Sequence, residues 1–155
     1  MRWKIIVGTL GAASVLGLAL ASQGAASGRS FDERTIRGIW GLSAAGQVMP
    51  PAAPQPTPFS AINRVVFDGA GNCEVVAQVN LAGTPVGPLV AETCEYSVDE
   101  DGFGRAVAQF GADSPVTGPL PIAFVIVEGG RELLVINSAV LVGGGVAKRM
   151  DQRER

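Results

Sequence analysis

The alternation of apolar and polar residues in the middle of the chain predicts four consecutive β-strands. In Cys73–Leu81, every second residue from Cys73 on is apolar, and polar side chains such as Glu74 and Gln78 stand between them. Successive side chains of a strand point to opposite faces, so one face is expected in a core and the other in water. The same reasoning predicts strands at Phe59–Phe67, Cys73–Leu81, Val90–Val98 and Gly104–Phe110.

A glycine-containing turn at residues 68–72 sets the register between the first two of these strands. Glycine adopts the positive φ values that tight turns need. If Phe67 pairs with Cys73, the apolar faces of the two strands coincide, whereas a shift by one residue would invert one of them. A second turn of the same kind pairs Val98 with Gly104 in the last two strands.

In this register a set of mostly small side chains points to the inside of the sheet. Glu92 is the one acidic residue that the register also places inside, and it marks either a β-bulge or a buried polar contact. Small inner side chains leave room for a ligand, or they are covered by side chains from the opposite wall. The remaining inner residues are Ala61, Asn63, Val65, Val75, Ala77, Val79, Tyr96, Ala106 and Ala108.

The chain before this stretch predicts a short helical turn, one strand and one long loop. Ser30 and Glu33 have the spacing of a capping box, which starts a helical turn. A strand is predicted at Gly38–Val48. The loop Met49–Pro58 contains five prolines, which lack the N–H of a β-ladder and stiffen an extended chain. Such a loop serves either as a lid over a site or as a rigid connector.

The chain after this stretch predicts three more strands, at Ile122–Val127, Glu132–Asn137 and Val140–Met150, the last broken at glycines 143–145. The first two are apolar on both faces, which is typical of strands that are covered on both sides. The second cover is either the N-terminal segment or another subunit. About eight antiparallel strands with mostly short hairpins predict an all-β fold, a meander closed or nearly closed into a barrel.

The first 21 residues predict a secretory signal peptide. Arg2 and Lys4 precede an apolar run at Ile5–Leu20, and Ala19-Leu20-Ala21 has the small-x-small form of a cleavage site. A signal anchor is the alternative, although glycines thin the run and no charged stop follows it. We therefore expect a secreted protein, periplasmic or extracellular, with no membrane span after leader removal.

Removal of the leader leaves one predicted domain, residues 22–150, and a charged tail, residues 151–155. Without Arg2 and Lys4, the Lys+Arg count falls from 12 to 10 against 14 Asp+Glu, a net charge of about −4. Nucleic acid is therefore not expected as a partner, because its backbone demands a basic surface.

The two cysteines, Cys73 and Cys94, allow one pairing. Export favours oxidation, and a hairpin centred on Gly83-Thr84 would make the two cysteines direct cross-strand neighbours, within reach of a disulfide. Two buried thiols are the alternative. Two cysteines without any histidine fall short of the usual metal-ligand set, so no metal is expected.

The absence of histidine also removes the Ser-His-Asp and Cys-His classes of catalytic site. A carboxylate acid/base pair is the remaining option, with Glu92 as the inward acid and Asn63 as its polar neighbour. The sequence favours a binding or structural protein over an enzyme, and we assign no catalytic residue and no cofactor.

The segment Phe31–Trp40 resembles the first signature of the lipocalins, and the chain is similar to small exported bacterial barrels of the lipocalin-like and allene-oxide-cyclase-like (calycin) type. In lipocalins a Phe-Asp pair opens a helical turn and a Gly-x-Trp, here Gly38 and Trp40, begins the first strand. The resemblance implies that Trp40 closes one end of the barrel, with Arg149 of the last strand stacked on its ring. The alternative is a core tryptophan that says nothing about ligands.

Two functions from different classes follow. The first is binding of a small hydrophobic molecule inside the barrel, lined by the inner residues named above. The second is a structural or interaction module that self-associates as a homo-oligomer through its two-faced apolar strands, without a ligand.

Overall fold

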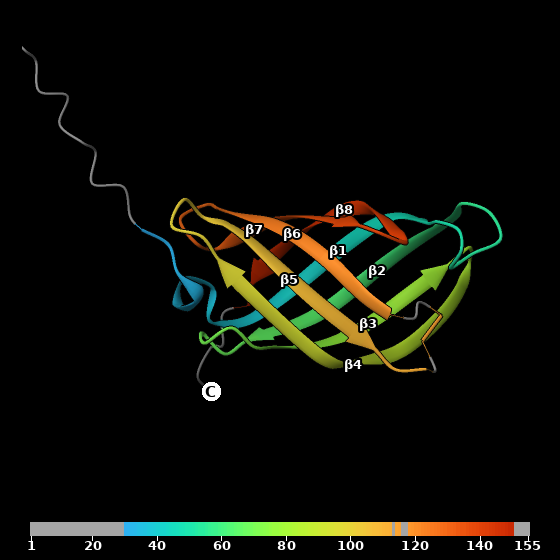
Figure 1. Cartoon of the computed structure of the whole chain (residues 1–155), viewed down its shortest axis with the longest axis horizontal. Helices are drawn as coiled ribbons and strands as arrows, with labels where there is room; N and C mark the ends of the chain where they lie inside the picture. The colour runs from blue at the N-terminus through green and yellow to red at the C-terminus, as the bar shows by residue number, and fades with distance from the viewer. Residues whose placement is uncertain (1–29, 113, 116–117, 151–155) are drawn as a thin grey trace, which may run out of the picture.

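The computed structural model describes residues 30–112, 114–115 and 118–150, which form a closed barrel of eight antiparallel strands in sequence order (Figure 1). This confirms the predicted all-β barrel. The predicted signal peptide and charged tail lie outside the described residues. After a 3₁₀ turn, η1 (Glu33–Ile36), the strands are β1 (Gly38–Val48), β2 (Thr57–Phe67), β3 (Cys73–Leu81), β4 (Thr84–Val98), β5 (Phe103–Phe110), β6 (Gly118–Val127), β7 (Glu132–Ser138) and β8 (Leu141–Arg149).

The barrel has two different ends. We call the end that carries η1 the closed end; its core cluster includes Trp40 and Phe67. The opposite end, which we call the mouth, carries the loops after β1, β3, β5 and β7 (Figure 1). Its smaller cluster contains Val48, Phe59 and Ala53, the last of which belongs to the proline-rich loop.

Several strands begin earlier than the sequence predicted, and prolines lie inside the added segments. β5 pairs with β4 only from Ala91 on, so the earlier part of β4 has a partner strand on one side only. The same holds for residues 118–121 of β6, which precede its first pair with β7 at Ile122. A proline on such an edge interrupts no ladder on the unpaired side. The strand prolines are Pro58, Pro85, Pro88, Pro119 and Pro121.

Both predicted turn registers are confirmed, because Phe67 pairs with Cys73 and Val98 pairs with Gly104. In each pair of strands the apolar faces therefore meet on the inside of the barrel, as the alternation required.

The predicted centre of the β3–β4 hairpin is wrong. Leu81 pairs with Thr84, so the turn is Ala82-Gly83. The register then shifts between Val79 and Ala77, and again before the isolated pair of Asn72 with Glu95. Extra residues on β4 bend the strand in this way, and the bulges bring the two cysteines opposite each other although the turn alone does not.

The last strand runs unbroken through the glycines that were expected to interrupt it. β8 pairs with β1 from Leu141 to Arg149. A Cβ atom at Gly143 would overlap the carbonyl oxygen of Ala45, and one at Gly145 would overlap that of Ser43. The glycines therefore permit the close approach of β1 and β8 that seals the barrel.

The helical turn is capped by a different residue from the one predicted. Asp32, not Ser30, is the N-cap: Asp32 Oδ1 accepts a hydrogen bond from the Thr35 amide at 3.1 Å, and Thr35 Oγ1 accepts one from the Asp32 amide at 3.1 Å. The reciprocal capping box is thus present but shifted by two residues, and the turn ends at Ile36.

Candidate functional site

A cavity of about 130 Å³ lies inside the barrel. It extends from the Phe67 and Phe124 rings at the closed end to Ser114 and Leu141 near the mouth. Eight of the inner residues predicted from the sequence line it: Ala61, Asn63, Val65, Val75, Ala77, Val79, Ala106 and Ala108.

Glu92 does not line the cavity, which corrects its predicted inward position. The β4–β5 register shifts between Ala91 and Thr93, so Glu92 is the extra residue of a β-bulge and its side chain is exposed. Its carboxylate lies over Gly111, where an added Cβ atom would come within 2.6 Å of Glu92 Oε1. The bulge interpretation therefore holds, and the inward carboxylate of the acid/base hypothesis is not present.

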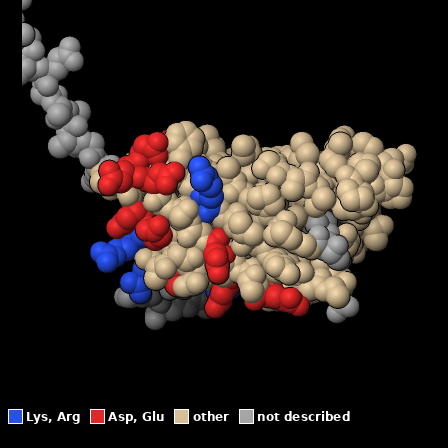
Figure 2. Space-filling view, viewed as in Figure 1, with Lys and Arg blue, Asp and Glu red and all other residues tan. Residues whose placement is uncertain are grey.

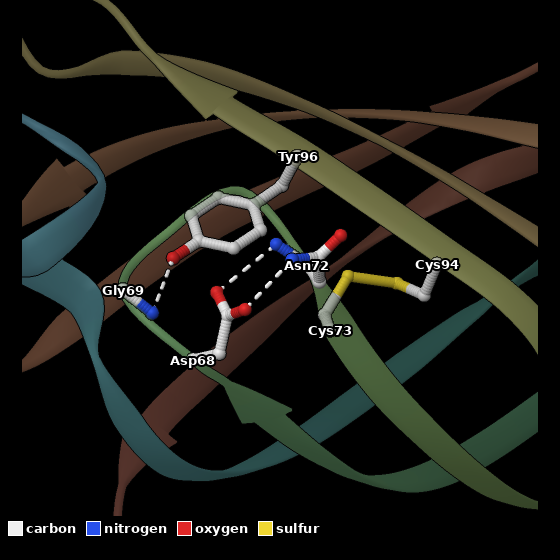
Figure 3. The surroundings of a disulfide bond; sticks show 6 residues. All are labelled: Asp68, Gly69, Asn72, Cys73, Cys94 and Tyr96. Carbon is white, nitrogen blue, oxygen red and sulfur yellow. Dashed lines mark hydrogen bonds between the residues drawn. A yellow bond between two sulfur atoms is a disulfide. The ribbon is translucent and has the colours of Figure 1, made fainter.

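Tyr96 is buried but belongs to the closed end and not to the cavity lining. Its hydroxyl accepts a hydrogen bond from the Gly69 amide at 3.0 Å (Figure 3). The same hydroxyl donates one to the Glu33 carbonyl at 3.1 Å. Burial raises the pKa of the Tyr96 hydroxyl above 10.0. Tyr96 thus ties η1 and the β2–β3 turn to the wall of the barrel.

Trp40 fills the closed end. Its side chain is fully buried, and Trp40 Nε1 donates a hydrogen bond to the Ile36 carbonyl at 2.7 Å. The guanidinium carbon of Arg149 lies 5.1 Å from the centre of the Trp40 ring, and Arg149 Nη2 donates to the Thr35 carbonyl at 2.6 Å. Gly38 begins β1 with φ of 127°, a conformation that favours glycine, and so leads the chain from η1 into the wall.

The predicted disulfide between Cys73 and Cys94 is confirmed, with a Cα–Cα distance of 4.9 Å (Figure 3). It joins β3 to β4 between the Val76–Val90 pair and the isolated Asn72–Glu95 pair, a stretch in which the two strands have no other ladder pair. A disulfide is compatible with export; secretion itself stays a prediction.

The β2–β3 turn next to the disulfide is held by Asp68. One carboxylate oxygen accepts a hydrogen bond from the Asn72 amide at 3.0 Å, and the other accepts one from the Asn72 side chain at 2.8 Å (Figure 3). The first oxygen also accepts one from the Ala70 amide at 2.6 Å. The Asn72 side chain and these amides lower the pKa of Asp68. This turn is therefore a rigid part of the closed end.

The cavity wall carries three polar side chains, Asn63, Ser114 and Asn137, and no charged one. Asn63 lies on β2 and Asn137 on β7. Asn137 was not predicted as an inner residue, because its strand is apolar on both faces and gave no sign of which face turns inward.

The sequence also missed most of the β1, β6, β7 and β8 lining. The inward face of β3, known from its alternation, could be carried along the order of paired strands to β1 and β8. On β6 and β7 both faces are apolar, so the sequence does not show which side chains point inward. The main missed lining residues of these strands are Leu42, Ala44, Val48, Leu120, Ile122, Leu133, Val135 and Ala147.

Charged side chains gather at the closed end, and the mouth shows none in the view of Figure 2. In the described residues, Asp, Glu, Lys and Arg are absent from the mouth loops and from the strand segments that lead to them. Asp113, in the connection after β5, lies outside the described residues. The charge-free stretches are residues 41–63, 75–91, 106–112, 118–127 and 133–147.

Within residues 30–112, 114–115 and 118–150, no three His, Cys, Asp or Glu side chains come together as a metal ion would require. No helix in this part of the chain is long and apolar enough to cross a membrane. The sequence matches no family model, no curated protein and no solved structure.

Proposed function

We propose that the protein binds a small apolar molecule inside the barrel. The observation that carries the proposal is the cavity of about 130 Å³ with its almost wholly apolar wall. A cavity of about 150 Å³ lined by Leu, Ile and Phe stays dry and takes up benzene. A ligand with roughly one ring, or a short branched chain, is the size that suits this space.

The energetic cost of the cavity supports the proposal. At about 24 cal/mol per Å³, leaving 130 Å³ empty costs about 3 kcal/mol of stability. Four alanines, Ala61, Ala77, Ala106 and Ala108, contribute to the space, and larger aliphatic residues would fill it. A ligand recovers this energy through the contacts that the empty wall lacks.

A matched pair of variants tests the proposal. Ala77→Leu adds a side chain inside the cavity, and Ala45→Leu makes the same change on the outer face of β1, where Ala45 is exposed. We expect calorimetry to show one toluene bound per chain of the wild type and of Ala45→Leu, and none for Ala77→Leu. Ala61→Leu is a second filling variant if Ala77→Leu folds poorly. Wild-type protein that binds no toluene would overturn the proposal.

A second candidate function, self-association without a ligand, is favoured by one specific observation. Leu134 and Ile136 on the outer face of β7 are 44% and 59% exposed, and Val142 and Val146 on β8 are 50% and 36% exposed. Leu134 pairs directly with Val146, so these side chains form one apolar strip.

Mass measured by sedimentation tests this candidate. A dimer that Ile136→Lys converts to a monomer, while Val90→Lys on the exposed face of β4 leaves it intact, would support the strip as the interface. A wild-type monomer at high concentration would remove this candidate.

A further inference from the structure

Two amide side chains reach the cavity without using their hydrogen-bonding capacity. Asn63 stands between Leu42 and Ala77 in the sheet, and Asn137 stands between Ile122 and Gly143. Within the described residues, neither amide makes a hydrogen bond; the third polar residue of the wall, Ser114, does have an interaction. The two amides are thus the unsatisfied polar groups of an otherwise apolar wall.

Both side chains are half-buried, and an amide that faces an apolar wall without a partner has hydrogen-bonding groups that a ligand can satisfy. Each Asn offers two N–H donors and one carbonyl acceptor. A ligand carbonyl can accept from either amide, and a ligand hydroxyl can both donate and accept. Few polar groups in an apolar pocket usually fix the orientation of the ligand.

The cavity wall has no charged side chain that could neutralise a charged ligand. No Lys, Arg, Asp or Glu lines the cavity. The guanidinium of Arg149 lies on the Trp40 ring and donates to the Thr35 carbonyl. A carboxylate or an ammonium group would therefore enter without a countercharge, which is costly in an apolar site.

We infer that the ligand is neutral and carries one carbonyl or hydroxyl oxygen, which binds the amide of Asn63 or that of Asn137 while its hydrocarbon part fills the cavity. This inference rests on the proposed function. It narrows the ligand class to small ketones, aldehydes, esters and alcohols and excludes fatty acids and amines.

Three isosteric probes test the inference on the wild-type protein. Acetophenone, α-methylstyrene and benzoate have the same number of non-hydrogen atoms in the same arrangement, and differ in carrying a carbonyl, a vinylidene group or a carboxylate. By calorimetry at neutral pH we expect acetophenone to bind about tenfold more tightly than α-methylstyrene, the worth of one good hydrogen bond. Benzoate is expected not to bind.

The variants Asn63→Leu and Asn137→Leu assign the effect to residues. We expect at least one of them to remove the preference for acetophenone while α-methylstyrene still binds, which also shows that the cavity is intact. Preference retained in both variants would overturn the role of the amides.

The outcomes separate this inference from the proposal on which it rests. Equal binding of acetophenone and α-methylstyrene by the wild type overturns the inference and leaves the apolar cavity standing. Benzoate as the tightest ligand overturns the neutral class. No binding of any of the three overturns both.

Discussion

The closed end and the mouth of this barrel differ in residue composition and in the interactions that stabilise them. The closed end joins buried aromatic rings, charged turns, a disulfide and a set of side-chain hydrogen bonds. The mouth has a small aliphatic cluster, no charged side chain among its described residues and all ten prolines of the chain. The contrast indicates that the interactions that stabilise the barrel are concentrated at one end, while the other end borders the cavity.

The pairing of the strands also differs between the two ends of the barrel. Toward the closed end the disulfide joins β3 to β4 where their ladder is interrupted, whereas near the mouth the first residues of β4 and β6 each have one partner strand and no such bond. Leu89, Phe110 and Leu120, which lie at the edges of this gap in the ladder, all line the cavity. Prolines stand where the pairing is incomplete, and prolines on an edge discourage pairing with another chain.

The largest expected difference between the two ends is in the free energy of unfolding that is lost when one aromatic side chain is removed from each end. Trp40→Ala should lower the free energy of unfolding by about 4–5 kcal/mol, because a fully buried ring, its hydrogen bond and its stacked arginine are lost together. Phe59→Ala at the mouth should cost about 3 kcal/mol, since Phe59 already borders a cavity. Urea unfolding followed by circular dichroism measures both. A larger loss for Phe59→Ala would reverse the assignment of the stable end.

Removal of the disulfide should have the next largest effect. The bond closes a loop with a sequence separation of 21, and the double variant Cys73→Ala/Cys94→Ala should lose about 3 kcal/mol. Urea unfolding of the oxidised wild type and of the double variant gives the difference. Wild-type protein unfolded in the presence of reductant is the control and should match the double variant. An unchanged midpoint for the double variant would mean that β3 and β4 hold together without the bond.

Tyr96→Phe should have the smallest effect and a distinctive pH dependence. Loss of the hydroxyl removes two hydrogen bonds at the closed end, about 1–2 kcal/mol. Because the pKa of folded Tyr96 is raised, the wild type holds this contribution fully below pH 10.0 and loses it as the pH rises through the folded pKa. Tyr96 is the only tyrosine, so the variant lacks this titration. The stability gap should therefore stay constant below pH 10.0 and narrow as the pH rises from there through the folded pKa; a gap that does not narrow above pH 10.0 would contradict the assignment.

The sequence predicted the barrel because β2, β3 and the second half of β4 alternate cleanly and have glycine turns between them. Alternation failed in two physical situations. Ile136 and its neighbours are apolar on both faces, so the inward position of Asn137 left no pattern. The bulge at Glu92 inserts one residue and changes which side chains face inward, and only the pairing of Ala91 and Thr93 with β5 reveals it.

The starts of two strands were predicted too late. The predicted strands began at Val90 and Ile122, whereas Pro88 and Pro121 lie on strand segments with one partner, a circumstance that depends on where the neighbouring strands stop. The hairpin centre was misplaced for a related reason, since the cysteines are aligned by bulges and not by the turn. Tertiary arrangement, and not local preference, decided these points.

The cavity also has a consequence for volume. A folded chain that encloses about 130 Å³ of empty space occupies more volume than its atoms require, and unfolding releases that space to water. Hydrostatic pressure drives such a change, and volume differences of tens of mL/mol are typical of it. The empty barrel should therefore unfold at a lower pressure than the same barrel with its cavity filled, so that compression reports on occupancy.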